Sequence, residues 1–380
     1  MPSIGIVAGE VSGDILGADL ISAIRKQCPE MQFIGIGGDR MKSAGCDCLY
    51  PVEKLSVMGI SEVFRHFREL LSVRNSIRGH FLNKRPDVFI GIDAPDFNFP
   101  LERVLRNAGI KTIHYVSPSI WAWREYRLKS IAKSVNLMLT LFPFEPAYYE
   151  KYNIPVRFVG HPLASKINLE PDQGAARGQL GLSEADKIIA LMPGSRKSEL
   201  GKLVEPFLKT ALWCNQHAGQ LHFVVNLVNE DTREYFEECV RKISPEIHLT
   251  TYTGSSLQVM EAADVVLLAS GTAALEAMLL KRPMVVAYKV SWLTYQIAKR
   301  LIRVPYVSLP NLLAGKQLVP EYLQDDCQPE IMGQAILDWL NNTNSVTKLV
   351  DEFTHIHNRI RLDSGELAAT AVLDMINARS

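Results

Sequence analysis

The sequence lacks the features that mark membrane-spanning, disulfide-stabilised or nucleic-acid-binding proteins. No apolar run in its 380 residues approaches the ~18 residues of a membrane span. Six cysteines are too few for a disulfide framework in so long a chain, so we expect reduced, cytosolic thiols. Basic and acidic residues number 41 each, and this zero net charge gives no global sign of nucleic-acid binding. The N-terminus has no basic region before a long apolar stretch, so we expect no signal peptide.

A zinc site is also not expected. Cys46 and Cys48 form a C-x-C pair, but no second pair or histidine lies at zinc-finger spacing.

Short β-rich runs alternate with longer amphipathic segments along the whole chain. This alternation predicts parallel sheets with helices on both faces. A single core stops growing at roughly 250–300 residues, and the polar stretch 170–174 separates two series of strands. We therefore predict an α/β protein with two doubly wound, Rossmann-like domains, 1–165 and 175–350, and a C-terminal helical segment, 351–380, that could pack back on the first. The predicted strands are Ile4–Ala8, Phe33–Ile36, Val88–Ile92, Thr112–Val116, Leu137–Leu141, Val156–Val159, Ile188–Met192, Leu221–Leu227, Ile247–Tyr252, Val265–Leu268 and Met284–Tyr288.

Ligands of such sheets bind outside the carboxyl ends of the strands, so two facing domains would share a central cleft. In the second domain, one strand runs into PGSR, where Arg196 offers a planar cation suited to phosphate. Another runs into SGT, where Ser270 is the candidate N-cap of a helix whose N-terminus would attract an anion. A carboxylate at Glu276 suits ribose hydroxyls. Ordinary turns are the plainer interpretation, but together they indicate a diphosphate site made of Gly194, Ser195, Arg196, Ser270, Gly271, Thr272 and Glu276.

The turns of the first domain have a different chemistry. The first strand ends in GEVSGD, whose Glu10 and Asp14 would repel a phosphate, so sugar hydroxyls are the better ligand. Another strand ends in HYVSPSIWAW, whose tryptophans belong either to the core or to a sugar or acyl pocket. The candidate residues on this side are Glu10, Ser12, Gly13, Asp14 and His114.

Residues 91–100 read GIDAPDFNFP and place two carboxylates around a proline. Asp93 follows the apolar run of a strand, which puts it at the carboxyl end of the sheet. Pro95 disfavours a continuous helix, so the two carboxylates should not share one helical face. We predict that Asp93 is a catalytic base, and that Asp96 caps a helix beginning near Phe97 or orients the loop.

Residues 55–82 combine apolar residues at helical spacing with interleaved arginines. The segment is either a helix buried in the domain or an interfacial helix whose apolar face enters a lipid boundary. The apolar residues are Val57, Met58, Ile60, Val63, Phe64, Phe67, Leu70 and Leu71.

Taken together, these motifs resemble the lipid-A-disaccharide synthase family of inverting GT-B glycosyltransferases over essentially the whole chain. The stretches that carry the resemblance are AGEVSGD (8–14), VMGISEV (57–63), GIDAPDFN (91–98), HYVSPSIWAW (114–123), PGSR (193–196), LLASGTAALE (267–276) and YVSLPNLLAG (306–315).

The resemblance implies transfer of the sugar of UDP-2,3-diacylglucosamine to the 6-hydroxyl of 2,3-diacylglucosamine 1-phosphate (lipid X), which forms a β-1′,6 linkage and releases UDP. It implies no metal and no cofactor, and a peripheral location on the cytoplasmic face of the inner membrane of Gram-negative bacteria. That location favours the interfacial interpretation of residues 55–82. The family's motif positions place Asp93 as the essential carboxylate and Glu10, Arg196 and Asn311 along the cleft.

Alternatives remain at this point. His114 is the rival base, because an imidazole needs less pKa adjustment near neutral pH. A UDP-N-acetylglucosamine 2-epimerase of GT-B architecture would need no acyl pocket, and a non-catalytic nucleotide-sugar-binding protein would tolerate loss of Asp93. A homodimer is a further expectation, and a nucleic-acid partner is not expected.

Overall fold

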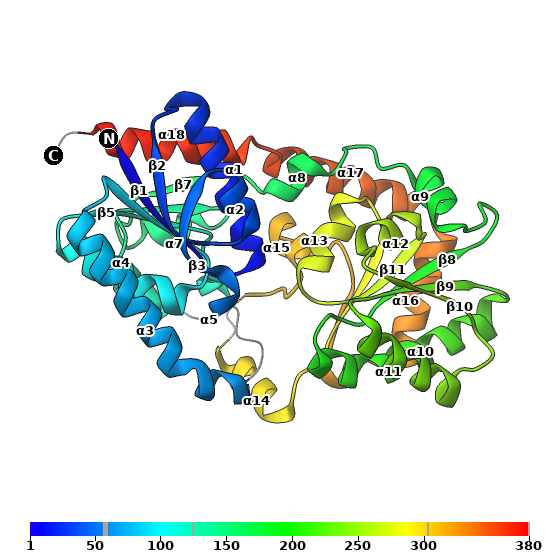
Figure 1. Cartoon of the computed structure of the whole chain (residues 1–380). Coiled ribbons are helices and arrows are strands. Elements are labelled where there is room, and N and C mark those ends of the chain that lie inside the picture. Colours follow the sequence, from blue (N-terminus) through cyan, green and yellow to red (C-terminus); the bar gives the residue numbers. More distant parts are fainter. Residues whose placement is uncertain (56–59, 124, 302–303, 379–380) are drawn as a thin grey trace. The chain divides into compact units, whose positions relative to one another are not determined.

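The computed structural model describes residues 1–55, 60–123, 125–301 and 304–378, and it divides the chain into two compact units. Unit 1 comprises Met1–Ser165 and Ile360–Ser380, and unit 2 comprises Lys166–Arg359. Each unit contains a parallel sheet with helices packed against it (Figure 1). The predicted α/β fold class is therefore confirmed, and each predicted strand is present with its ends within one residue of the prediction.

The sheet of unit 1 has the order β3-β2-β1-β4-β5-β6-β7. Central strands such as β4 are apolar at each position, because a parallel sheet is covered by helices on both faces. The sequence prediction missed the edge strand β3. The strands are β1 Ser3–Ala8, β2 Gln32–Gly37, β3 Cys46–Pro51, β4 Val88–Ile92, β5 Lys111–Tyr115, β6 Leu137–Thr140 and β7 Val156–Phe158. The helices are α1 Val11–Gln27, α2 Asp39–Ser43, α3 Ile60–Lys84, α4 Pro95–Asn107, α5 Ile120–Trp123, α6 Leu128–Ile131, α7 Pro146–Glu150, α8 Pro162–Lys166 and α18 Ser364–Asn377.

The sheet of unit 2 has the order β10-β9-β8-β11-β12-β13, and its short edge strand β13 was not predicted. The strands are β8 Ile188–Met192, β9 His222–Leu227, β10 His248–Thr253, β11 Val265–Ala269, β12 Met284–Tyr288 and β13 Glu321–Leu323. The helices are α9 Gln173–Leu180, α10 Lys197–Ala218, α11 Glu230–Ile243, α12 Ser256–Ala262, α13 Thr272–Leu279, α14 Trp292–Leu301, α15 Leu309–Ala314, α16 Pro329–Asn341 and α17 Thr343–Ile360.

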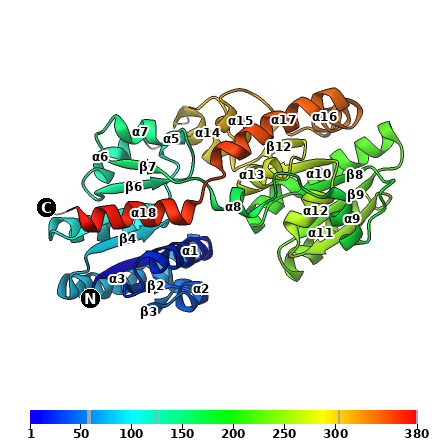
Figure 2. The same cartoon turned by 90° about the horizontal axis from the view of Figure 1, so that it is seen from above.

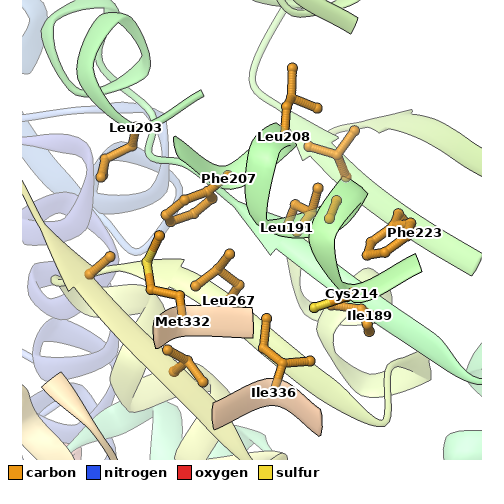
Figure 3. Packing of buried hydrophobic residues seen from close by; sticks show 14 of the residues in the cluster. Ile189, Leu191, Leu203, Phe207, Leu208, Cys214, Phe223, Leu267, Met332 and Ile336 are labelled. Carbon is orange, nitrogen blue, oxygen red and sulfur yellow. The ribbon is translucent and has the colours of Figure 1, made fainter. Parts of the chain in front are cut away.

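One cluster of buried hydrophobic residues in unit 2 lies between its sheet and helices α10 and α16. Phe207 of α10 and Met332 of α16 are fully buried, and both lie over Leu191 and Leu267 of the central strands (Figure 3). Burial of such side chains contributes about 1.5–3 kcal/mol each. This core holds the carboxyl ends of β8 and β11 in fixed positions.

The C-terminal helix α18 belongs to unit 1 although it follows unit 2 in the chain. It runs alongside α1 (Figures 1 and 2) and buries Ala368 and Val372 in the same cluster as Ile6 of β1. Polar contacts secure its ends, because Gln27 donates a hydrogen bond to Glu366 at 3.0 Å and Lys111 donates to the carbonyl of Met375 at 2.7 Å.

The cysteines are free thiols. Across the described ranges, no helix is both long enough and apolar enough to cross a membrane.

Candidate functional site

In each sheet the order of the strands reverses at one point. Ligands of open parallel sheets bind at that point, outside the carboxyl ends of the strands. In unit 1 the strand order reverses between β1 and β4, which are neighbours. The turn after β1 carries Glu10, and the turn after β4 carries Asp93. Gly9 N donates to the carbonyl of Ile92 at 3.2 Å, which holds these two turns side by side.

The turn at Asp93 is a sharp elbow between β4 and α4. Asp93 and Ala94 have φ angles of 54° and 42°, both in the left-handed region that L residues seldom adopt. The main-chain N–H of Asp93 donates to the carbonyl of Tyr115 at 2.9 Å, and that of Ala94 donates to Asp93 Oδ1 at 2.8 Å. The Asp93 carboxylate is half-buried, so it is accessible to a ligand at the carboxyl edge of the sheet.

Glycine at position 9 is required by this elbow. A Cβ at Gly9 would lie 2.0 Å from the Cβ of Ala94, which is far inside van der Waals contact. Glycine therefore lets the turn after β1 come directly against the elbow.

The GEVSGD turn is only partly available to a ligand. Glu10 and Ser12 are exposed at the start of α1. Asp14 is instead buried, and it accepts hydrogen bonds from the main-chain N–H groups of Gly38 and Met41 at 2.7 and 3.1 Å. Its carboxylate secures the start of α2, and Gly13 is buried beside it, so neither residue is exposed to an acceptor in this structure.

His114 was the rival for the catalytic base, and its burial contradicts that role. The side chain is 0% exposed, and its Nδ1 lies 2.7 Å from Oε1 of Glu102, which is also 0% exposed. The Phe99 ring covers it at a centroid distance of 4.3 Å. A sugar hydroxyl cannot reach this imidazole, so His114 does not line an acceptor site.

Asp96 does not cap α4 as predicted. The helix begins at Pro95, with Ala94 as its N-cap residue, so Asp96 already lies in the first turn. Its exposed carboxylate pairs with the guanidinium of Arg127. The alternative role, orienting the loop, fits this contact.

In unit 2 the strand order reverses between the neighbours β8 and β11, and the two predicted phosphate turns follow these strands. After β8, Gly194 has a φ of 113° and leaves room for Glu199. Glu199 Oε2 accepts hydrogen bonds from the N–H groups of Ser195 and Arg196 at 3.2 and 3.4 Å. These two N–H groups are therefore already occupied, and the exposed Arg196 guanidinium is the group that this turn offers to a phosphate.

The second of these turns follows β11 and leads into α13. The helix begins at Thr272 with Gly271 as its N-cap residue, so the prediction of Ser270 as the cap is wrong. Gly271 and Thr272 are exposed, Ser270 is half-buried, and a Cβ at Gly271 would meet no atom within 4 Å. The open N-terminus of α13 can thus be approached closely by an anion.

Two further side chains of unit 2 lie close to these turns. Glu276 is one turn into α13 and partly buried, and burial raises the pKa of its carboxyl. Tyr288, which the sequence prediction missed, ends β12 beside β11 and is 38% exposed. Burial also raises the pKa of Tyr288, and the nearby Glu199 adds to that rise. Its position as the last residue of a predicted strand was the signal that could have identified it.

Asn311 does not line an open site. It is 0% exposed, and its amide is fully engaged. The Nδ2 group donates to Val319 O at 2.9 Å and to Glu321 Oε1 at 2.8 Å, while Oδ1 accepts from the N–H groups of Leu318 and Val319 at 2.7 and 3.0 Å. Asn311 therefore ties α15 to the segment that leads into β13.

The predicted interfacial segment is partly described. Its C-terminal half is buried, because Val73, Ile77 and Phe81 recur at helical spacing and pack in the core of unit 1. Leu70 and Leu71 are half-buried. In Figure 1 the helix begins away from the sheet and ends against it. Val57 and Met58 lie outside the described residues, as do the side chains of Ile60, Val63, Phe64 and Phe67.

A buried carboxyl that the sequence did not indicate lies at the same edge of unit 1. Glu145 Oε2 accepts hydrogen bonds from the N–H groups of Leu141 and Phe142 at 3.1 and 2.9 Å. Burial raises the pKa of Glu145 to about 7. Trp121 contributes a side-chain hydrogen bond to this carboxyl, so it has a structural partner.

The cavity and the acidic, histidine and cysteine side chains of the described residues do not indicate a second ligand site that would replace these turns. A cavity of about 780 Å³ in unit 2 is lined by Arg177, Asp264 and Arg282, at the opposite edge of the sheet from the phosphate turns. Within the described ranges, no group of three or more His, Cys, Asp or Glu side chains could hold a metal ion.

Comparisons with known sequences show the family to which the chain belongs. A family model described as lipid-A-disaccharide synthetase matches residues 4–375. The lipid-A-disaccharide synthase of Haemophilus influenzae is 48% identical over 382 residues, covering 100% of this chain and 98% of that protein. The lipid-A-disaccharide synthase of Pseudoalteromonas translucida is 50% identical over 377 residues, covering 99% of this chain and 97% of that protein.

Solved structures of the same architecture are much more distant in sequence. The UDP-GlcNAc 2-epimerase of Neisseria meningitidis, bound to UDP-GlcNAc, is 10% identical with a TM-score of 0.63, covering 99% of this chain and 100% of its own. The glycotransferase of kitacinnamycin is 15% identical with a TM-score of 0.64, covering 98% of this chain and 99% of its own. At these identities the likeness concerns the fold alone.

Proposed function

The chain belongs to the lipid-A-disaccharide synthetase family, and we propose from this membership that it joins UDP-2,3-diacylglucosamine to 2,3-diacylglucosamine 1-phosphate. It is a glycosyltransferase of lipid A biosynthesis with a GT-B fold. The alternative of a UDP-N-acetylglucosamine 2-epimerase rests on fold likeness at 10% identity, whereas the synthases share about half of the residues. The products are a tetraacyl disaccharide 1-phosphate and UDP.

The observation that supports this function best is the difference in charge between the turns of the two units, at the points where the strand order reverses. Unit 2 offers cationic and N–H groups suited to a diphosphate, namely Arg196 and the start of α13. Unit 1 offers carboxylates suited to hydroxyl groups, namely Glu10 and Asp93. A nucleotide-sugar donor and a hydroxyl acceptor need this division of charge.

The proposed reaction is a single displacement with inversion. The 6-hydroxyl of the acceptor attacks the anomeric carbon from the face opposite UDP, while Asp93 accepts the hydroxyl proton. The bond between the anomeric carbon and the diphosphate oxygen breaks, and its electron pair leaves with UDP. Arg196 and the N-terminus of α13 stabilise the negative charge that develops on the leaving diphosphate.

The direct test of this function supplies both acylated sugars. Purified protein is incubated with UDP-2,3-diacylglucosamine and 2,3-diacylglucosamine 1-phosphate, and products are identified by mass spectrometry. We expect a disaccharide 1-phosphate together with UDP. Formation of UDP or an epimerised donor without a disaccharide would contradict the assignment.

Arg196 is expected to contribute mainly to binding of UDP. The Arg196 side chain is exposed, and its ion pair with Glu199 has an N–O distance of 3.7 Å. Such an exposed ion pair contributes little free energy, so the guanidinium can turn to a phosphate at little cost. Arg196→Ala should weaken UDP binding roughly 10–100-fold, the scale of one lost charge-assisted contact. Isothermal titration calorimetry with UDP measures this change.

Lys197→Ala is the matched control, because Lys197 is adjacent and its ion pair with Asp231 is exposed at both ends. It should bind UDP nearly as tightly as the unmodified protein. Equal UDP affinity of the Arg196→Ala protein would mean that the nucleotide is held elsewhere.

We further propose that the beginning of α3 binds the surface of an anionic membrane. The chemistry of the substrates supports this proposal, because both carry acyl chains. The exposed cation Arg68 lies toward this end of the helix and would be attracted to anionic lipid headgroups. Its buried half, including Phe81, anchors the helix in unit 1 and leaves the other half to bind lipid.

Changing Phe64, Phe67 and Leu71 together to serine should release the protein from anionic liposomes, because the apolar contribution to interfacial binding is lost. Co-sedimentation with vesicles of phosphatidylglycerol and phosphatidylethanolamine measures it. Leu49→Ser is the control, because Leu49 is an exposed leucine on β3 of the same unit. Unchanged sedimentation of the folded triple variant would rule out this surface.

A further inference from the structure

Three buried polar side chains lie directly behind the Asp93 elbow. Asn98 and Glu102 are one turn apart on α4, and His114 lies on β5. Each is 0% exposed. Within the described ranges, Asn98 Oδ1, Glu102 Oε2 and His114 Nε2 have no hydrogen-bond partner. Buried polar groups are normally satisfied, so such a cluster calls for a functional reason.

The backbone of β4 is shaped to admit these side chains. Gly91, two residues before Asp93, is the register partner of His114. A Cβ at Gly91 would lie 2.2 Å from Glu102 Oε1 and 2.9 Å from the Cβ of Asn98. Glycine therefore opens the space in which Glu102 and His114 approach each other to 2.7 Å.

Two hydrogen bonds connect this cluster to the elbow. Asn98 Nδ2 donates to the carbonyl of Asp93 at 2.8 Å. The N–H of Asp93 donates to the carbonyl of Tyr115, the residue that follows His114 on β5. The contact between Glu102 and His114 thus fixes α4 to the part of β5 that holds Asp93. Burial raises the pKa of Glu102, and the His114 imidazole opposes that rise.

The elbow needs such support. Two consecutive L residues at positive φ are unfavourable, and they persist only where the surroundings hold them. We propose that Asn98, Glu102 and His114 are positioning residues that hold the strained elbow and aim the Asp93 carboxylate at the acceptor hydroxyl. This inference rests on the role of Asp93 in the proposed function.

The test replaces Glu102 in the full-length protein and measures kcat and KM separately. Glu102→Met keeps the length of the side chain but loses the contact with Nδ1, and Glu102→Gln keeps a neutral hydrogen bond. We expect kcat of Glu102→Met to fall roughly 10–100-fold, the scale of a small misplacement of a catalytic group, with KM for the UDP-sugar nearly unchanged. Glu102→Gln should recover most of that loss.

Thr112→Val provides the control for a purely structural effect. Thr112 is also 0% exposed on β5, and its hydroxyl donates to the carbonyl of Ser134 at 2.8 Å. This variant should lower the melting temperature and leave kcat of the folded protein unchanged. If Glu102→Met does not fold, Asn98→Ala tests the same proposal. We expect this variant to have a lower kcat and a faster hydrogen exchange of the Asp93 main-chain amide.

A double variant separates this inference from the role of Asp93. If Glu102 acts through Asp93, Glu102→Met should cost nothing further in an Asp93→Asn protein. Full activity of Glu102→Met, or an undiminished loss in the double variant, would overturn the positioning role and leave Asp93 as the base. Normal turnover by Asp93→Asn alone would overturn both.

Discussion

Replacing Asp93 by asparagine is expected to lower the rate of disaccharide formation by roughly 10²–10⁴, the usual contribution of a general base. Asparagine has the same shape but cannot accept the proton of the acceptor hydroxyl. Its amide oxygen can still accept the hydrogen bond from the N–H of Ala94, so the elbow should keep its conformation. The measurement is kcat from mass-spectrometric detection of the disaccharide, with both substrates saturating.

The affinity for UDP is the internal control for this variant. Asp93 lies in unit 1, and the phosphate turns lie in unit 2, so UDP binding should not change. Asp96→Asn is the matched variant, because Asp96 is an exposed carboxylate on the same helix start. It should retain nearly full turnover. A folded Asp93→Asn protein with a normal rate would exclude Asp93 as the base.

Asn311→Ala should destabilise unit 2 by about 3–5 kcal/mol, the range of a disrupted buried hydrogen-bond network. Alanine would leave the N–H groups of Leu318 and Val319 without the oxygen that now accepts from both. Glu321 would also lose one donor, although it still accepts from Ser308 Oγ at 2.6 Å. Differential scanning calorimetry should show the unit melting about 10 °C lower, at roughly 2–4 °C per kcal/mol.

Asn229→Ala is the comparison, since Asn229 caps α11 of the same unit and its Oδ1 accepts from Thr232 N at 3.0 Å. Loss of such a cap costs about 1 kcal/mol. The Asn311→Ala protein that remains folded should bind UDP normally. Weakened UDP binding together with unchanged stability would restore Asn311 as a ligand-binding residue.

The strands and their ends were predictable because parallel strands are covered on both faces and read as short apolar runs. Val88–Ile92 and Ile188–Met192 match the predicted ranges. Residues that follow such runs must lie at the carboxyl edge, so Asp93 and Arg196 could be placed without a structure. The short edge strands β3 and β13 carry weaker patterns, since Cys46 is the one fully buried residue in these two strands.

Which of the polar residues face a ligand could not be predicted, because burial depends on segments distant in sequence. His114 is buried because Glu102 and Phe99 of α4 cover it. Asn311 is buried because the chain returns at 318–321 to bind its amide. The left-handed geometry of Asp93 also has no signal in GIDAPDFNFP, since neither Asp93 nor Ala94 is a glycine.

The return of α18 to unit 1 has a consequence for the order in which the protein is made. Unit 2 is one continuous stretch, Lys166–Arg359, whereas the core of unit 1 includes Val372. On the ribosome, every residue of unit 2 is therefore available before the core of unit 1 can close. The half of the protein that is synthesised first is the half whose core is completed last.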